Sequence, residues 1–361
     1  MSPQLDGVSD RVVVRAPAKI NLCLSVRGRR DDGYHELTTV LQTVSLRDEL
    51  HLRLTGPRAR RHHPAGRRRM RVEVRSDDAR IPAQGNLVHA AARLLGVSTR
   101  VLGEREQTSE TVAATAAGSS RPERPWPCPS VRLVGDDDGA EDDDATLGTV
   151  IELVKAIPVG GGMAGGSTDA AATLLGLDAL WGCDLSHDEL MALAAELGSD
   201  VPFCLIGGTA IATGRGERVA SVLNRGRYHW VVGVDEDPLP TPEVYRAWDE
   251  LDWGDGAEGA DDAPFEAVLT ALRAGDPEQL GAALHNDLEP AACALRPALA
   301  ERRDALRAAG ALGAIVSGSG PTLLGLARDA EHAEAIATAV REHFDAVHVV
   351  RAPAAGPEIL A

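Results

Sequence analysis

The sequence predicts an α+β protein with two domains, and three observations support this fold class. Strand patterns dominate the first part of the chain, where apolar residues alternate with small or polar ones at 11–26, 37–46, 49–54 and 71–75. A glycine-rich segment then leads from a strand into two helices, and from about residue 228 strands and amphipathic helices mix again. The 361 residues suffice for about two domains with separate cores. We place the domains at 11–224 and 225–352, with tails at 1–10 and 353–361.

The elements follow in order along the chain. The strands from 11 to 54, which turn at 31–33, and the strand at 71–75 are expected to form an antiparallel sheet, and a helix is predicted at 86–95. A strand at 150–157 precedes the glycine-rich segment, helices follow at 168–180 and 186–197, and a strand and turn at 204–216 close the domain. The second helix begins with a capping box, Ser186 and Glu189, and stops at Gly198. The second domain is expected to hold strands at 229–234, 314–316, 323–326 and 346–350 and a helix at 329–344.

Three segments interrupt this pattern. The arginine-rich stretch at 58–69 contains no aromatic residue, so we favour a solvated loop over a nucleic-acid patch. Residues 103–148 are rich in small, polar and acidic residues, which predicts a mostly disordered insertion. A metal site built from its aspartates is the less favoured alternative. A third, acidic loop is expected at 253–262.

The composition disfavours several classes of function. The formal net charge of −17 repels polyanions, so neither nucleic acid nor an anionic membrane is an expected partner. No stretch approaches the roughly 20 apolar residues of a membrane span, and the N-terminus lacks the pattern of a signal peptide. The five cysteines form no C-x-x-C pair and predict neither a zinc site nor a disulfide framework. We expect a cytoplasmic protein without a bound metal of its own, and leave open whether it is a monomer or a homodimer.

The most informative segment predicts a phosphate-binding loop. Its residues are Pro158, Val159, Gly160, Gly161, Gly162, Met163, Ala164, Gly165, Gly166, Ser167 and Thr168. Five glycines within seven positions let backbone N–H groups approach an anion, and the following helix points its positive end at the same place. Ser167 or Thr168 would cap that helix or provide a hydroxyl ligand for phosphate or Mg²⁺.

Two other phosphate-binding motifs fit the loop less well. Gly160, Gly162 and Gly165 match the dinucleotide fingerprint, but the loop lies in mid-chain after a sheet predicted to be antiparallel, where a Rossmann unit is not expected. A Walker A motif is excluded because no Gly-Lys-Ser/Thr follows.

Two charged residues are candidates for phosphoryl transfer, which needs a base for the attacking hydroxyl group and cations for the developing charge. Asp200 stands between a helix end and an apolar turn, and Lys19 is an ammonium group in an apolar strand. Only two of the 37 basic residues are lysines, Lys19 and Lys155. This suggests that lysine occurs where the larger, planar guanidinium group of arginine cannot replace the compact ammonium group. The structural alternatives are a helix N-cap for Asp200 and a surface charge for Lys19. For the glycine cluster at 317–322, a hairpin turn and a substrate-facing loop are equally compatible with the residues.

Three segments, 17–22, 158–171 and 317–322, together resemble the motifs of the GHMP small-molecule kinases. Segments 32–37, 198–203, 241–245 and 286–289 are similar to those members that phosphorylate a cytidine diphosphate conjugate of a methylated tetritol in non-mevalonate isoprenoid biosynthesis. The resemblance implies a left-handed βαβ unit in the N-terminal domain and a ferredoxin-like C-terminal domain. It also implies transfer of phosphate from ATP to the substrate's 2-hydroxyl group, with Mg²⁺.

The resemblance further implies roles for single residues. Asp200 would take the proton of the hydroxyl group, and Lys19 would orient that pair and offset charge. The remaining assignments are Tyr34 and Tyr245 on the two faces of the cytosine ring, His35 at its edge, Asn21 and Thr241 in the substrate channel, and Asn86, Leu87 and Lys155 around adenine.

One departure and two alternatives accompany this resemblance. The family often has Leu-Gly-Gly where this chain has Met163, Ala164 and Gly165, and alanine fits there if its φ is negative. Another GHMP kinase, of the homoserine or mevalonate type, would lack the base-stacking residues around Tyr34. A non-catalytic ligand-binding protein on this fold would have lost Lys19 or Asp200, and both are present.

Overall fold

The computed structural model describes residues 10–55, 68–96, 98, 131–133, 147–251 and 262–360. These residues form a nine-stranded sheet and a four-stranded sheet. The predicted arginine-rich loop and the two acidic segments lie almost entirely outside the described ranges. One part of the 103–148 segment is described as a strand, β4 (Val131–Leu133), so this segment is not entirely irregular.

Two long strands, β1 (Arg11–Arg29) and β2 (His35–Thr55), pair antiparallel and form the centre of the larger sheet. Two strands had been predicted at 37–46 and 49–54, but β2 is continuous. The register of the pair shifts between Pro17 and Lys19 and again between Asn21 and Cys23. Bulges of this kind re-aim side chains, and they lie on both sides of the two candidate site residues of β1.

The larger sheet is mixed, and the prediction of an antiparallel sheet was therefore wrong. Strand β5 (Leu147–Val154) pairs antiparallel with β2, whereas β3 (Arg68–Ser76) pairs parallel with β5 and with β4. Parallel neighbours need a long crossover connection. Between β3 and β5 this connection includes a helix at 87–96, which gives a βαβ unit. Strand periodicity reports which residues alternate and carries no information on which strands become neighbours.

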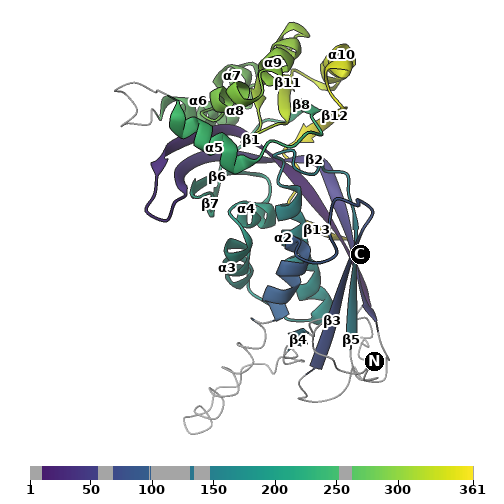
Figure 1. Ribbon diagram of the computed structural model, residues 1–361. Coiled ribbons are helices and arrows are strands. Elements are labelled where there is room, and N and C mark those ends of the chain that lie inside the picture. Colours follow the sequence, from purple (N-terminus) through teal and green to yellow (C-terminus); the bar gives the residue numbers. More distant parts are fainter. Residues whose placement is uncertain are drawn as a thin grey trace.

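The helix at 87–96 and the helices α2 (Gly165–Trp181), α3 (His187–Leu197) and α4 (Val201–Ile206) lie on one face of this sheet (Figure 1). Both halves of the predicted capping box are formed at Ser186, and Gly198 ends α3 as predicted. The segment predicted as a strand and turn instead begins within α4, which is too short for its periodicity to be read, and continues as the hairpin of β6 (Thr209–Gly214) and β7 (Arg218–Ser221).

The C-terminal part is built around the four-stranded sheet, whose strands are β8 (Tyr228–Val234), β10 (Gly313–Val316), β11 (Leu323–Ala327) and β12 (Ala346–Ala352). All its pairs are antiparallel, in the order β10-β11-β8-β12, which is the strand order of a ferredoxin-like domain. The helices of this part are α5 (Thr241–Glu250), α6 (Ala263–Ala274), α7 (Pro277–Ala283), α8 (Glu289–Leu295), α9 (Ala298–Ala308) and α10 (Ala330–Val340), which a 3₁₀ turn (Arg341–His343) extends.

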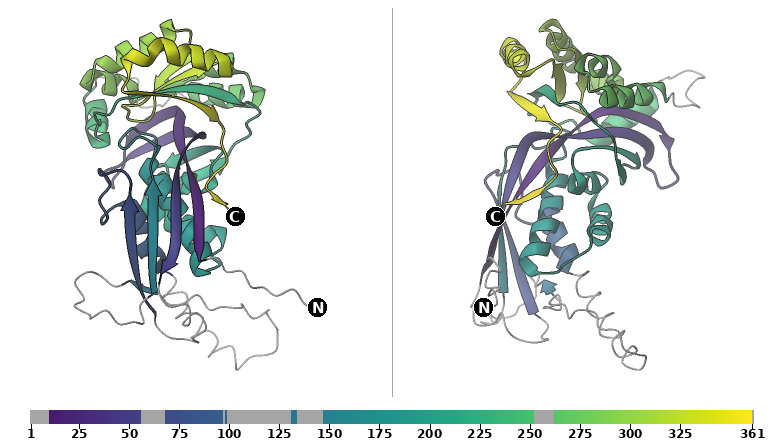
Figure 2. Two further views of the ribbon diagram at one scale, coloured as in Figure 1. Left: turned by 90° about the vertical axis from the view of Figure 1, so that its right-hand side faces the viewer. Right: turned by 180° about the vertical axis from the view of Figure 1, so that it is seen from behind.

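Strand β1 connects the two parts of the molecule. Its residues Ala18, Ile20 and Leu22 lie in one buried cluster with Tyr228 and Trp230 of β8. Figure 2 shows the long strands rising from the larger sheet beneath the smaller one. Two short strands, β9 (His285–Asn286) and β13 (Glu358–Leu360), also pair with β1. The predicted C-terminal tail therefore returns to the larger sheet. The domain boundary near residue 224 stays a prediction.

Candidate active site

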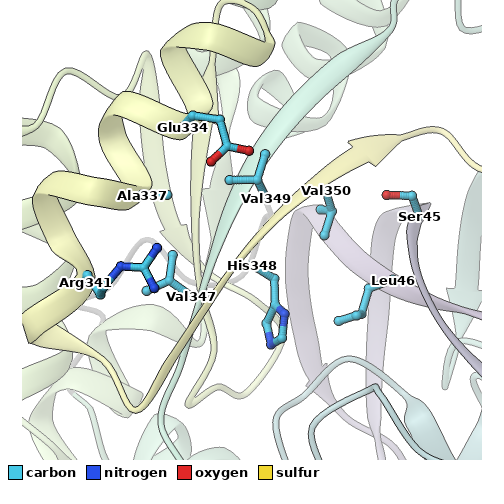
Figure 3. Close-up of a pocket in the computed structure, with 9 residues that line it drawn as sticks. All are labelled: Ser45, Leu46, Glu334, Ala337, Arg341, Val347, His348, Val349 and Val350. Carbon is cyan, nitrogen blue, oxygen red and sulfur yellow. The ribbon is translucent and has the colours of Figure 1, made fainter.

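A cavity of about 1120 Å³ opens between the two parts of the molecule. Side chains of β1, the glycine-rich loop, the 199–200 turn, α5 and the loop at 318–320 line it. Its volume exceeds the roughly 300–1000 Å³ of a site for one drug-sized ligand, so two substrates can be accommodated. A second hollow of about 350 Å³ lies among Ser45, Leu46, α10 and β12 (Figure 3) and shares no lining residue with the first.

The glycine-rich loop packs closely against the loop at 317–322. A Cβ atom on Gly162 would lie 2.9 Å from the carbonyl oxygen of Gly320 and 3.0 Å from that of Ser317, and the φ angle of Gly162 is +74°. Only glycine fits such a position. The backbone N–H of Lys19 donates to the carbonyl of Met163 at 3.1 Å, so β1 also fixes this loop. The segment 317–322 joins the antiparallel strands β10 and β11, so the hairpin turn is confirmed. Its residues Gly318, Ser319 and Gly320 also line the cavity, and contact with a substrate stays a prediction.

Ala164 adopts a left-handed conformation, with φ 55° and ψ 33°. The condition under which alanine was said to fit, a negative φ, is therefore not met. Left-handed backbone costs an alanine roughly 1–2 kcal/mol because its Cβ crowds the carbonyl oxygen. The strained residue occupies the N-cap of α2, directly before the helix end that is expected to face phosphate.

The two hydroxyl groups of the loop differ in their surroundings. Ser167 lines the cavity in the first turn of α2. Thr168 is fully buried, and its hydroxyl donates to the carbonyl of Pro17 at 2.8 Å. Thr168 therefore connects α2 to β1 and is not placed to bind a ligand.

The candidate pair meets in the cavity. Lys19 Nζ lies 3.6 Å from Asp200 Oδ2 and donates to Asn21 Oδ1 at 2.8 Å. Only 6% of the Lys19 side chain is exposed, so it is not the surface charge of the structural alternative, whereas 35% of the Asp200 side chain is exposed. Asp200 occupies the N-cap position of α4, but its side chain makes no capping hydrogen bond. Its carboxylate is therefore free to face Lys19 and the cavity.

Lys155 lies in a buried ion cluster. Its Nζ donates to Asp169 Oδ2 at 2.7 Å and to the fully buried Asp48, whose other oxygen accepts the backbone N–H groups of Ala156 and Ile157. Burial and the neighbouring Asp48 raise the pKa of Asp169, against the lowering effect of Lys155. The pKa of Lys155 is raised too, because the two carboxylates outweigh its desolvation. The ammonium group thus anchors the start of the glycine-rich loop to α2.

Asn86 and Leu87 lie at the cavity wall next to Lys155. The side chain of Asn86 accepts the N–H of His89 at 2.7 Å and thereby caps the helix at 87–96. Leu87 faces the loop, since a Cβ atom on Gly166 would lie 3.4 Å from its side chain.

Aromatic residues form the opposite end of the cavity. Tyr34 is 56% exposed, whereas His35 stacks on Tyr245 with ring centroids 4.8 Å apart, and its Nε2 donates to Asp249 Oδ1 at 2.7 Å. Burial and the nearby Asp200 raise the pKa of Tyr245 to about 12, so its hydroxyl stays neutral. One face of Tyr245 is thus covered by His35, and the predicted pairing of Tyr34 with Tyr245 across a base stays a prediction. Next to them, the hydroxyl groups of Thr241 and Ser319 lie 2.8 Å apart.

All the residues predicted for the site except Thr168 line this cavity. The sequence analysis did not single out Arg29, Arg80, Arg215 and Arg246, which line it as well. With Lys19 and Lys155 these make six cationic side chains in the cavity wall. Lys155 is paired with Asp48 and Asp169, and Arg80 with Asp78, whereas Arg29, Arg215 and Arg246 form no ion pair with the described residues. In a chain of net charge −17 these three arginines are the side chains suited to a polyanionic small molecule. Arginine is too frequent in this chain for its position to signal a site.

Comparisons with known proteins agree with this geometry. Residues 134–208 match the GHMP kinases N terminal domain, and residues 268–346 match the GHMP kinases C terminal family. The chain is 42% identical to a 4-diphosphocytidyl-2-C-methyl-D-erythritol kinase of Nocardioides, covering 90% of this chain and 91% of the relative, and 44% identical to one of Salinispora tropica, covering 92% and 88%. A crystal structure of 4-(cytidine 5'-diphospho)-2C-methyl-D-erythritol kinase superposes with a TM-score of 0.64 at 32% identity, covering 95% of this chain and 99% of that chain.

The fold is that of a GHMP kinase, an ATP-dependent small-molecule kinase. Within this class, the chain belongs to the family of the 4-diphosphocytidyl-2-C-methyl-D-erythritol kinases. A homoserine kinase from Cytophaga hutchinsonii, 20% identical with a TM-score of 0.62, covering 99% of this chain and 100% of that chain, shares the fold. No helix of the described residues is long and apolar enough to cross a membrane.

Proposed function

We propose that this chain transfers the γ-phosphate of ATP to the 2-hydroxyl group of 4-diphosphocytidyl-2-C-methyl-D-erythritol. The observation that carries the proposal is the placement of Lys19 and Asp200 in one cavity with a glycine-rich loop and a cluster of aromatic side chains. The loop and the helix end suit a triphosphate, the aromatic cluster suits a base, and the charged pair suits the hydroxyl group between them.

Asp200, Lys19 and the glycine-rich loop have separate roles in the proposed reaction. Asp200 accepts the proton of the attacking hydroxyl group, for which its uncapped carboxylate is free. Lys19, held by Asn21, orients this carboxylate and offsets the negative charge that develops on the transferred phosphoryl group. The backbone N–H groups of the glycine-rich loop hold the β- and γ-phosphates.

The nucleotide is expected to bind with Mg²⁺. The described residues contain no group of three or more His, Cys, Asp or Glu side chains that could hold a metal ion. Mg²⁺ bound with a nucleotide takes most of its ligands from phosphate oxygens and water, so such a group is not required. Ser167 is the loop hydroxyl that would reach the ion, which would neutralise charge on the phosphate oxygens.

The substrate assignment is tested by the consumption of ATP with three acceptors: 4-diphosphocytidyl-2-C-methyl-D-erythritol, homoserine and mevalonate. We expect turnover with the cytidine conjugate alone. Turnover with homoserine or mevalonate in its place would overturn the substrate assignment while keeping the kinase, and the absence of turnover with any acceptor would overturn the proposed activity.

A further inference from the structure

Arg215 is an arginine of the cavity wall whose guanidinium group makes no hydrogen bond or ion pair with the described residues. Asp32 interacts with it electrostatically at longer range. The guanidinium group lies over the ring of Tyr34, whose centroid is 5.1 Å from Cζ. Of the other arginines of the wall, Arg80 is neutralised by Asp78 at 2.6 Å. An arginine that lies over an aromatic ring without a hydrogen-bonded carboxylate is available for an anionic ligand.

The backbone around Arg215 is built to hold it in place. It follows the end of β6 and lies between Gly214 and Gly216, whose φ angles are +76° and +109°. Its own N–H donates to Glu217 Oε2 at 2.7 Å. Positive φ angles at both flanking residues, together with this hydrogen bond, define a tight turn that fixes where the side chain starts.

The turn also places Arg215 between the catalytic candidate Asp200 and the aromatic side chain of Tyr34. A Cβ atom on Gly216 would lie 3.5 Å from Cβ of Ser199, the residue before Asp200, so the turn adjoins the reacting end of the cavity. The guanidinium group itself lies over Tyr34, at the aromatic end. Along the chain of the substrate, base, ribose, diphosphate and tetritol follow in this order. A ligand with its base at Tyr34 and its tetritol hydroxyl at Asp200 therefore carries its diphosphate past Arg215.

We propose that Arg215 binds the diphosphate of the cytidine conjugate and thereby sets the distance between the base and the reacting hydroxyl group. This assignment rests on the proposed function. Guanidinium groups bind phosphates through paired N–H donors, and the guanidinium group of Arg215 lies within cation–π distance of the Tyr34 ring. Neither the glycine-rich loop nor Lys19 is needed for this contact, so the diphosphate subsite is separate from the site of the transferred phosphate.

The test compares two ligands that differ only in the diphosphate. The binding of CDP and of cytidine is measured by calorimetric titration to the unaltered protein, to Arg215→Gln and to Arg218→Gln, always with saturating ADP so that the nucleotide site is occupied. Arg218 is the matched control, because it lies three residues further on, is exposed and does not line the cavity. We expect Arg215→Gln to weaken CDP about 10- to 100-fold, the range of a charged hydrogen bond, to leave cytidine within about twofold, and Arg218→Gln to change neither.

Each other outcome contradicts the subsite. Equal weakening of CDP and cytidine would show that Arg215 acts only on the Tyr34 ring, and unchanged affinities would show that it touches neither ligand. A rise in KM for ATP without a change for CDP would move the contact to the nucleotide. In all three cases, turnover of the cytidine conjugate by the unaltered protein would leave the proposed function standing. If the unaltered protein neither binds CDP nor turns over the conjugate, both proposals fall.

Discussion

Replacement of Lys19 by methionine probes the charged pair most simply, because methionine keeps the length of the buried stem and removes the ammonium group. The lysine side chain is 6% exposed, and its Nζ lies 3.6 Å from Asp200 Oδ2 and 2.8 Å from Asn21 Oδ1. Two unit charges 3.6 Å apart attract each other by about 5 kcal/mol at an effective dielectric constant of about 20.

The exposure of Asp200 reduces this value. Its side chain is 35% exposed, so solvent screens about half of the attraction and roughly 2 to 3 kcal/mol remains. An attraction of similar size between Lys19 and the charge that develops on the transferred phosphoryl group would be lost in Lys19→Met, which lowers kcat/KM about 30- to 150-fold. Lys19→Arg is expected to fail as well, although it keeps the charge, because Nζ already lies 3.8 Å from the position of a Cβ atom on Gly318 and a guanidinium group is larger.

The assay is steady-state ADP formation at saturating ATP with varied cytidine conjugate. Thermal unfolding of each variant shows whether the protein remains folded, since the loss of a buried charge partner also acts on stability. A Lys19→Met variant that remains folded and retains more than about a third of the normal kcat/KM would refute the assigned role. Its loss of less than about threefold would be far smaller than the expected loss of roughly 30-fold or more.

Three further predictions concern the base, the loop and the buried carboxylates. Tyr34→Ala should raise KM for the cytidine conjugate about 5- to 150-fold with little change in KM for ATP, since stacking on a base contributes roughly 1 to 3 kcal/mol; an unchanged KM would exclude the stacking role. Ala164→Gly should raise the free energy of unfolding by about 0.5 to 1 kcal/mol, because glycine removes the strain of φ 55° at some cost in chain entropy; urea unfolding measures this, and a loss of stability would contradict it. The raised pKa of Asp169 means that the folded state holds a proton which the unfolded state has lost, so this group lowers stability as pH rises from about 4 to about 8. Asp169→Asn should therefore flatten the decline in free energy of unfolding between pH 5 and pH 8, and an undiminished decline would count against the shift.

The parts of the site that are local in sequence were predictable. The glycine-rich loop is recognisable in the sequence because several N–H groups, residues without a Cβ atom and a helix start fall within a few positions. The structure shows why Gly162 must lack a Cβ atom, which would collide with the loop at 317–322. The capping box at Ser186 and the stop at Gly198 are local as well.

The parts that depend on distant neighbours were not predictable. The position of Asp200 between a helix end and an apolar turn is only a weak signal among 54 acidic residues, and its selection depended mainly on the family resemblance. Lys155 was noticed because lysine is rare here, but its partners Asp48 and Asp169 emerge only when β2 and α2 are brought together. The same reason explains the parallel pairing of β3 with β5, and why the left-handed Ala164 was not foreseen.

The central claim is that Asp200 accepts the proton of a hydroxyl group on the cytidine conjugate while Lys19 and the glycine-rich loop hold the charge of the transferred phosphate. Its most direct test is the single-turnover rate of phosphate transfer from labelled ATP to 4-diphosphocytidyl-2-C-methyl-D-erythritol by Asp200→Asn. The account predicts a rate about 10²- to 10⁴-fold below that of the unaltered protein, with the affinity for ATP retained. A transfer rate within a few-fold of normal, with the product labelled at the same hydroxyl group, would contradict it.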